Sequence, residues 1–196
     1  MIDAIKQYDE NLFLWLNGSH SAGCDVVMWY VSKMWLWIPV YAWMIFMLFK
    51  RKSKASAAWA LACIACLVFL TDFVAVKTIK ETVMRLRPTH NPALQNMVHM
   101  VQDEMGNFYK GGKYGFFSNH SSNFAGVALF FGLVAKPIAR WIQLTLVAWV
   151  ILIGYSRIYL GVHYPLDVLA GFAYGCCAAL CMYWVYGKLD KQEAVK

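Results

Sequence analysis

Five apolar runs, each close to the length needed to cross a bilayer, constrain the fold of this chain more than any other feature. They cover residues 26–49, 55–76, 116–135, 138–155 and 166–186. A helix needs about 20 apolar residues to span the hydrocarbon core of a membrane. Only 15% of the residues are charged, whereas about 25% are charged in ordinary soluble domains, so that class is excluded. We therefore expect an all-α, polytopic membrane helical bundle with about five transmembrane helices.

Residues 2–17 predict an amphipathic helix that lies on the membrane surface. Their apolar side chains recur at helical spacing, at Ile5, Tyr8, Leu12, Trp15 and Leu16, and Asn17-Gly18 supplies a stop. Four of the first ten residues are charged, which makes the segment too polar to span a bilayer or to act as a signal peptide. We expect a single domain over residues 1–196, which begins with this interfacial helix and a linker over residues 1–24.

The distribution of basic residues predicts which side of the membrane each loop faces. The densest basic segment is Lys50–Lys54, and the positive-inside rule places it in the cytoplasm. If the runs then cross in alternation, residues 77–115, which include an outer loop at 88–115, and residues 156–165 lie outside. The net charge of +7 is spread among apolar runs, which favours the anionic headgroups of a lipid bilayer as partners over nucleic acid.

Arg157, His163 and Asp167 lie in a polar stretch between the last two apolar runs, on that outer side. Pro165 suits the first position of a helix, so Asp167 falls in the first turn of that helix, within reach of His163. A carboxylate that binds one imidazole nitrogen fixes the tautomer and leaves the other nitrogen free to attack. The alternative is that Asp167 only caps the helix and complements its dipole.

A pair of cations precedes Pro88 on the same side of the membrane. In a helix, Lys80 and Arg87 are two turns apart on nearly the same face, whereas Arg85 points elsewhere. Pro88 disfavours helical geometry at the residue before it, so the helix is expected to end there. Lys80 and Arg87 are suited to grip a phosphate. The alternative is that both side chains only reach towards lipid headgroups.

Ser118, Asn119 and His120 stand at the start of the third apolar run. Ser and Asn are good helix N-caps, and free N–H groups at the N-terminus of a helix favour anions. The strictly apolar part of this run, from Phe124 to Ala135, is too short to span a bilayer. We therefore expect His120 to lie within the helix and to face the bundle interior. The alternative is a hydroxyl-rich cap with an incidental histidine.

The three stretches together contain the groups that phosphoryl transfer requires. Cations and backbone donors stabilise the charge that develops on the phosphoryl oxygens. One histidine can serve as the nucleophile, and a second can protonate the leaving group. Because no cluster of carboxylates suggests a metal site, we expect no metal ion and no other cofactor.

These stretches resemble the signature of the type 2 phosphatidic acid phosphatase superfamily, the membrane lipid phosphate phosphatases. The family's first motif, KxxxxxxRP, is matched by Lys80, Arg87 and Pro88. Its third motif, SRxxxxxHxxxD, is matched by Ser156, Arg157, His163 and Asp167. Its second motif, PSGH, is matched in part by Phe117-Ser118-Asn119-His120. The resemblance extends over residues 60–185 and implies a helical bundle with its site at the outer ends of the helices.

The resemblance also implies a role for each matched residue. His163 would be the nucleophile, Asp167 the residue that orients it, and His120 the general acid. The phosphate-binding residues would be Lys80, Arg87, Arg157, Ser118 and Asn119, the last in place of a glycine whose N–H lies close to the phosphate.

The predicted function is therefore metal-independent hydrolysis of a phosphate from a membrane lipid, through a phosphohistidine intermediate. Candidate substrates are undecaprenyl diphosphate, the phosphates of lipid A, phosphatidate and phosphatidylglycerophosphate. A phosphotransferase that uses the same site and a non-catalytic lipid-binding or transport protein are the alternatives. The outward site favours the inner membrane of a bacterium, with the site on the periplasmic side. The sequence leaves the oligomeric state open.

Overall fold

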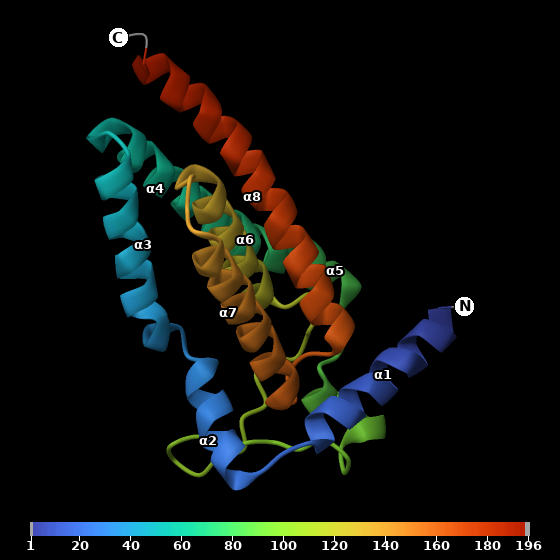
Figure 1. The fold of residues 1–196 in the computed structure, drawn as a ribbon. Coiled ribbons are helices and arrows are strands. Elements are labelled where there is room, and N and C mark those ends of the chain that lie inside the picture. The colour runs from blue at the N-terminus through green and yellow to red at the C-terminus, as the bar shows by residue number, and fades with distance from the viewer. Residues whose placement is uncertain (1, 195–196) are drawn as a thin grey trace.

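In the computed structural model, which describes residues 2–194, the chain is a bundle of helices, and no β-strand occurs in that range (Figure 1). The α-helices are α1 (Ile2–Gly18), α2 (Ala22–Val31), α3 (Ile38–Arg51), α4 (Lys54–Phe69), α5 (Glu81–Val83), α6 (Asn119–Val134), α7 (Arg140–Tyr159) and α8 (Pro165–Ala194). Short 3-10 and π-helical turns join several of them. The prediction of an all-α helical bundle is confirmed.

Three helices of the described chain are long and apolar enough to cross a membrane. They cover Lys54–Val83, Arg140–Tyr159 and Pro165–Lys191, and the bent pair Ala22–Val31 and Met34–Arg51 is a fourth if it forms one span. α6 has 16 residues, so it is shorter than the length that a full span needs. Of the five predicted spans, the one that corresponds to α6 is therefore too short to cross the bilayer as a helix by itself.

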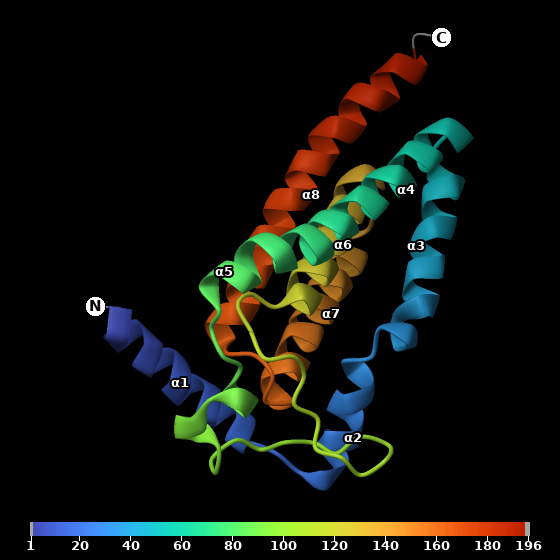
Figure 2. The same ribbon diagram turned by 180° about the vertical axis from the view of Figure 1, so that it is seen from behind.

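The first apolar run, residues 26–49, does not form one straight helix, contrary to the prediction. It is divided between α2 and α3, which are bent by 68° at a short break. The break falls at the polar pair Ser32-Lys33. The Ser32 hydroxyl donates to the carbonyl oxygen of Trp29 at 2.9 Å, and the Lys33 ammonium lies 3.6 Å from the centre of the Trp29 ring. α2 therefore lies at one end of the bundle, beside the loop of residues 88–115 (Figures 1 and 2).

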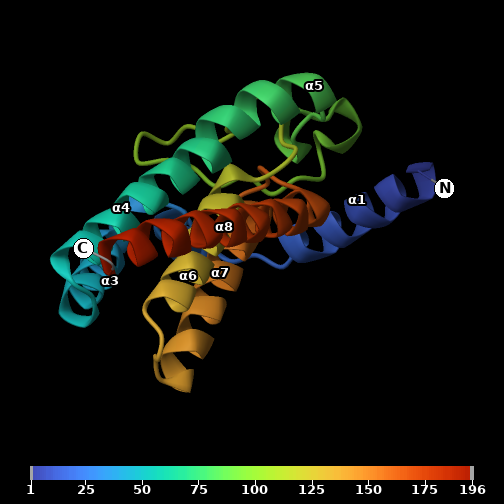
Figure 3. The ribbon, with the colours of Figure 1, turned by 90° about the horizontal axis from the view of Figure 1, so that it is seen from above.

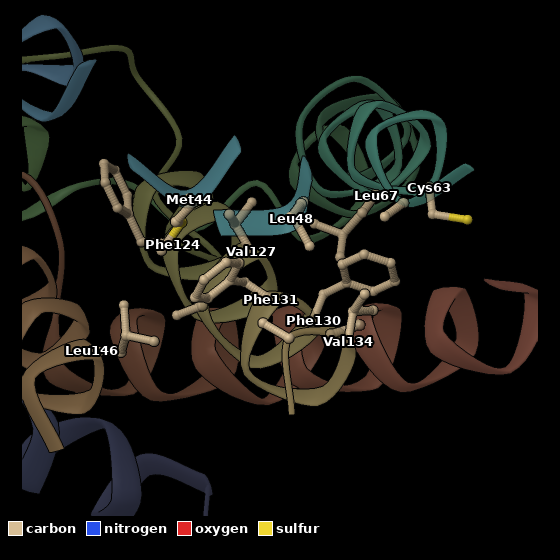
Figure 4. Packing of buried hydrophobic residues seen from close by; sticks show 14 of the residues in the cluster. Met44, Leu48, Cys63, Leu67, Phe124, Val127, Phe130, Phe131, Val134 and Leu146 are labelled. Atoms are coloured by element: carbon tan, nitrogen blue, oxygen red, sulfur yellow. The ribbon is translucent and has the colours of Figure 1, made fainter. Parts of the chain in front are cut away.

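A continuous apolar core joins the helices of the bundle. Figure 4 shows Leu48 of α3, Leu67 of α4, and Phe130 and Phe131 of α6 meeting in this core, and all four are fully buried. In lipid, close packing rather than the exclusion of water holds helices together. α6 is buried along most of its length, so it is the central helix against which the others are fixed.

Glycine residues allow α6 and α8 to cross at close range (Figure 3). A Cβ atom added at Gly171 of α8 would stand 2.6 Å from the carbonyl oxygen of Ser118, at the start of α6. A Cβ atom at Gly126 of α6 would stand 3.0 Å from the carbonyl oxygen of Gly175, and one at Gly175 of α8 would clash with the carbonyl oxygen of Ser122. Small residues let the backbones of membrane helices approach in this way. The crossing fixes the N-terminus of α6 beside the first turns of α8.

α1 forms as predicted, but the residues that it buries are not its apolar stripe. The buried residues follow one another at intervals of four: Asp9, Phe13 and Asn17. Tyr8 and Trp15, which belong to the apolar stripe, are 76% and 70% exposed. α1 therefore docks through a mostly polar face and leaves most of its apolar face exposed. Its position on the membrane surface stays a prediction.

Candidate active site

The three polar stretches meet at one end of the bundle, where α1, α2 and the loop of residues 88–115 also lie (Figures 1 and 2). His163 lies between α7 and α8 and is 1% exposed. Its Nδ1 atom is 3.6 Å from Oδ2 of Asp167, in the first turn of α8. This distance is longer than a hydrogen bond, and Nδ1 has no other partner in the described chain. Asp167 thus faces Nδ1, and Nε2 lies on the other edge of the ring.

Asp167 caps α8 as well as facing the imidazole. The backbone N–H of Tyr164, the residue before α8, donates to its Oδ2 at 3.0 Å, as in the capping box in which the third helical residue accepts from the N-cap N–H. The backbone N–H of Ser118 donates to the carbonyl oxygen of Asp167 at 3.0 Å, which ties the start of α6 to the start of α8. The two interpretations of Asp167, helix cap and partner of His163, are therefore compatible.

Lys80, Arg87 and Arg157 surround His163 with positive charge. Lys80 and Arg157 are only 9% and 2% exposed. Within the described residues, none of the three forms an ion pair with a carboxylate. Burial, followed by the charges of Arg87, Arg157 and Lys80, holds the pKa of His163 well below its usual range. The imidazole is therefore neutral at pH 7, and the three cations are available to an anion.

The outer loop of residues 88–115 contributes hydrogen-bonding groups to the site. Nε of Arg87 donates to the carbonyl oxygen of Tyr114 at 3.1 Å, and Nη2 of Arg157 donates to the hydroxyl of Tyr109 at 3.2 Å. A Cβ atom at Gly115 would stand 3.0 Å from Oδ2 of Asp167. Burial and the neighbouring Arg157 lower the pKa of Arg87 to about 10, so this guanidinium stays charged at neutral pH.

The start of α6 brings His120 and Ser118 into the site, whereas the side chain of Asn119 points elsewhere, and the predicted role of the Asn119 backbone N–H stays a prediction. His120 is close enough to His163 and to the cations for their charges to interact. Ser118 is the N-cap of α6, and its side chain is fully buried. The side-chain amide of Asn119 instead donates to Oδ1 of Asp72 at 2.6 Å, so it is directed towards the π-helical turn that follows α4.

The segment before Pro88 departs from the prediction. The sequence predicts a helix that continues to Pro88, but α5 ends at Val83, and Met84 has a φ of 47°, in the left-handed region. The chain then runs extended, since Leu86 forms a bridge with Tyr114. The interpretation of Lys80 and Arg87 as residues on one helical face is therefore wrong, although both side chains reach the same site.

Arg85, which the sequence analysis set aside, binds the carboxylate that faces His163. Its Nη1 atom is 2.8 Å from Oδ1 of Asp167, and its Nη2 atom is 2.6 Å from Oδ2 of Asp9. The prediction that Arg85 points away from the site assumed a continuous helix, but the helix ends at Val83, before this residue. The remaining signal was the count of basic residues in residues 80–87, which exceeds what a two-cation grip needs.

The charge of the site suits an anion. Lys80, Arg87 and Arg157 carry three positive charges, and the nearby carboxylate of Asp167 is already bound by Arg85. Within residues 2–194, no group of three or more His, Cys, Asp or Glu side chains is placed to hold a metal ion, and metal independence stays a prediction. A phosphate group, which Arg and Lys side chains bind by charge-assisted hydrogen bonds, fits this surplus of cations.

Sequence comparison places these residues in a family. Residues 57–191 match the PAP2 superfamily. The chain is 31% identical over 185 residues to the lipid A 4'-phosphatase of Porphyromonas gingivalis, which covers 94% of this chain and 75% of that protein. It is 32% identical over 191 residues to the lipid A 4'-phosphatase of Bacteroides thetaiotaomicron, which covers 96% of this chain and 81% of that protein.

A solved structure shares the fold. The crystal structure of a transmembrane PAP2 type phosphatidylglycerolphosphate phosphatase from Bacillus subtilis superposes with a TM-score of 0.68 at 24% identity, over 94% of this chain and 87% of that chain. The motif residues Lys80, Arg87, Arg157 and His163 all fall inside the matched region. The family match and these relatives show that the chain belongs to the PAP2 superfamily and is one of its membrane lipid phosphatases.

Proposed function

We propose that this protein hydrolyses a phosphate from a lipid A-type saccharide lipid through a phosphohistidine formed on His163. The observation that carries the proposal is the environment of His163: a buried, neutral imidazole that faces Asp167 and is surrounded by three cations without carboxylate partners. Such a site combines a nucleophile with the positive charge that a phosphoryl group needs as it is transferred.

In the first step, Nε2 of His163 attacks phosphorus, because Asp167 faces the Nδ1 edge of the ring. A P–N bond forms and the P–O bond to the lipid breaks. His120, which holds a proton once the negative charge of the bound phosphate offsets the neighbouring cations, gives that proton to the leaving oxygen. Asp167 stabilises the positive charge that develops on the His163 ring.

In the second step, water attacks the phosphohistidine, and His120 takes up a proton from that water. The P–N bond breaks, inorganic phosphate is released, and His163 is neutral again. Lys80, Arg87 and Arg157 balance the charge of the phosphoryl oxygens in both steps. His120 thus serves as acid and then as base, which restores its starting state after each turnover.

Two observations support the substrate class and the orientation. The lipid A 4'-phosphatases align with nearly the whole chain, so a phosphate on a lipid-linked sugar is the substrate we propose. The site lies at the end of the bundle opposite the basic turn between α3 and α4 (Figure 1). If this turn is cytoplasmic, as the positive-inside rule predicts, the site faces the periplasm from the inner membrane of a bacterium.

The test is phosphate release by the purified protein in detergent with excess EDTA, beside His163→Ala. The panel contains lipid A, undecaprenyl diphosphate, phosphatidate and phosphatidylglycerophosphate. We expect release from lipid A that survives EDTA and is absent in His163→Ala, with a labelled enzyme intermediate that is stable to base and labile to acid. Preferred release from another lipid would overturn the proposed substrate. Transfer of the phosphate to a second lipid would overturn hydrolysis, and lipid binding without release would overturn catalysis.

A further inference from the structure

Behind the pair formed by His163 and Asp167 lies a second carboxylate, which a single guanidinium joins to the first. Arg85 donates to Oδ1 of Asp167 at 2.8 Å and to Oδ2 of Asp9 at 2.6 Å. Oδ2 of Asp167, the other oxygen of that carboxylate, is the one that faces His163. The four side chains therefore form one continuous row: Asp9, Arg85, Asp167 and His163.

The side chains of this row are more buried, and in contact with more neighbours, than those of a surface salt bridge. The carboxylate side chains of Asp9 and Asp167 are 1% and 0% exposed, and Arg85 is 21% exposed. The Arg85 guanidinium also lies 4.0 Å from the centre of the Tyr164 ring, a cation–π contact. Phe13 of α1 packs edge-on against that ring at 5.4 Å. A planar guanidinium fixed in this way sets the angle of each carboxylate that it binds.

Asp9 also contacts the backbone beside Asp167. Its Oδ1 atom accepts a hydrogen bond from the backbone N–H of Leu166 at 2.9 Å, one residue before Asp167. Burial raises the pKa of Asp9 despite the opposing effect of Arg85, so the carboxylate depends on its two donors to remain ionised. Asp9 is therefore bound to both the side chain and the main chain that position Asp167.

Asp9 comes from α1, the helix predicted to lie at the membrane surface. On the same face of α1, Asn17 donates from Nδ2 to the carbonyl oxygen of Tyr159 at 2.8 Å and accepts from the backbone N–H of His99 at 2.8 Å. These contacts fix α1 against the end of α7 and against the outer loop. The opposite, apolar face of α1 is exposed, as at Tyr8 and Trp15. One helix thus has an exposed apolar face and, on its other face, a carboxylate that is bound to the active site.

We propose that Asp9 and Arg85 are positioning residues of the phosphatase. Together they hold the Asp167 carboxylate at the angle that directs Nε2 of His163 towards phosphorus. α1 then contributes a positioning residue to the active site, in addition to its predicted contact with the membrane surface. This inference rests on the proposed nucleophilic role of His163, and neither Asp9 nor Arg85 touches the substrate.

The test compares Asp9→Asn with Asp3→Asn, which removes an exposed carboxylate from the same helix. Inhibition constants for orthovanadate and inorganic phosphate are the decisive readouts, because an inhibition constant does not change with the fraction of protein that is folded. Orthovanadate takes the five-coordinate geometry of the transferring phosphoryl group and needs a correctly directed imidazole. Inorganic phosphate needs only the cations.

For Asp9→Asn we expect kcat to fall about 10- to 100-fold, because a misplacement of about 1 Å in a catalytic group costs up to about 100-fold in rate. The inhibition constant for orthovanadate rises about tenfold or more, and that for phosphate changes less than about twofold. Asp3→Asn matches the wild-type protein in all three. Arg85→Lys keeps the charge but cannot bind two carboxylates in one plane, so it shows the same pattern if Asp9→Asn proves too unstable to purify.

Unchanged inhibition by orthovanadate in Asp9→Asn and Arg85→Lys, with activity lost only in proportion to unfolded protein, would overturn the positioning role. A wild-type protein that releases no phosphate from any lipid would overturn the proposed function together with this inference. Activity in the wild type without any effect of these substitutions would overturn the inference alone.

Discussion

Gly175 of α8 lies so close to Ser122 of α6 that a Cβ atom on Gly175 would clash with the Ser122 carbonyl oxygen. No side chain fits at that distance, so α6 and α8 can cross here only if residue 175 is glycine. One helix turn earlier on each helix, Gly171 faces Ser118 in the same manner. This crossing sets the distance between the start of α6, which carries His120, and the start of α8, which carries Asp167.

Gly175→Ala is expected to force α6 and α8 apart and to impair both stability and activity. Overpacking of this kind costs about 1–3 kcal/mol, and a displacement of about 1 Å in a catalytic group lowers the rate about 100-fold. Thermal unfolding in detergent and phosphate release measure the two effects. The control is Gly187→Ala on the same helix, where a Cβ atom meets nothing within 4 Å. Equal behaviour of the two variants would contradict the assigned crossing.

Met84→Gly is expected to stabilise the protein. Met84 adopts a φ of 47°, a left-handed conformation that costs a residue other than glycine about 1–2 kcal/mol. Glycine adopts it without strain but loses more entropy on folding, so we expect a net gain of about 1 kcal/mol, and an increase of about 2–4 °C in the melting temperature.

The control for Met84→Gly is Val83→Gly, one residue earlier, where the backbone is helical. Glycine in a helix costs about 1 kcal/mol, so this variant melts at a lower temperature. If both variants melt below the wild type, the contacts of the Met84 side chain outweigh its backbone strain.

Local spacing was sufficient to predict the contact between His163 and Asp167. The two residues are four positions apart, with a proline that begins a helix between them, so the chain has little freedom to separate them. The all-α fold followed equally directly, because runs of about 20 apolar residues in a membrane protein have few other solutions than helices.

The contact between Asp9 and Arg85 could not be predicted in this way. The two residues are separated by 76 positions, and the charges of α1 indicated only that the segment is too polar to span a membrane. The left-handed turn at Met84 was also hidden, because methionine carries no turn signal. Burial of polar residues on the docked face of α1 depends on tertiary partners, which helical periodicity does not report.

Arg157→Lys is expected to lower kcat/KM about 100-fold or more, the effect of removing one well-placed donor from a transition state. Arg157 is 2% exposed, and its Nε atom has no hydrogen-bond partner in the described chain, so a donor is free for phosphate. Lysine keeps the charge but loses the planar fork. Steady-state kinetics on the preferred lipid measure the loss, and Arg140→Lys, at the opposite end of α7, serves as control. Activity within a few-fold of wild type would show that charge alone suffices.

The depressed pKa of His163 predicts a specific dependence of stability on pH. Its ordinary pKa is 6.5, and burial and cations hold the folded value well below that. Below about pH 6.5 the unfolded chain therefore binds a proton that the folded chain does not, so stability is lost as the pH falls. Unfolding temperatures from pH 7.5 to 5 measure this loss. His163→Gln cannot take up this proton, so its unfolding temperature is expected to fall less over the same pH range.

Arg87→Gln tests whether neighbouring positive charge lowers the pKa of His163, and the readout is the pH dependence of activity. Among the neighbouring charges, that of Arg87 lowers the pKa of His163 most. Its removal therefore raises this pKa, so the imidazole becomes protonated, and unable to attack, at a higher pH. The acid limb of the kcat/KM profile therefore moves to higher pH relative to the wild type. The second ionisation of a substrate phosphate, near pH 6, appears in both profiles and cancels in the comparison. Arg140→Gln leaves the limb in place, and an equal displacement in both variants would mean that net charge, rather than proximity to His163, controls the limb.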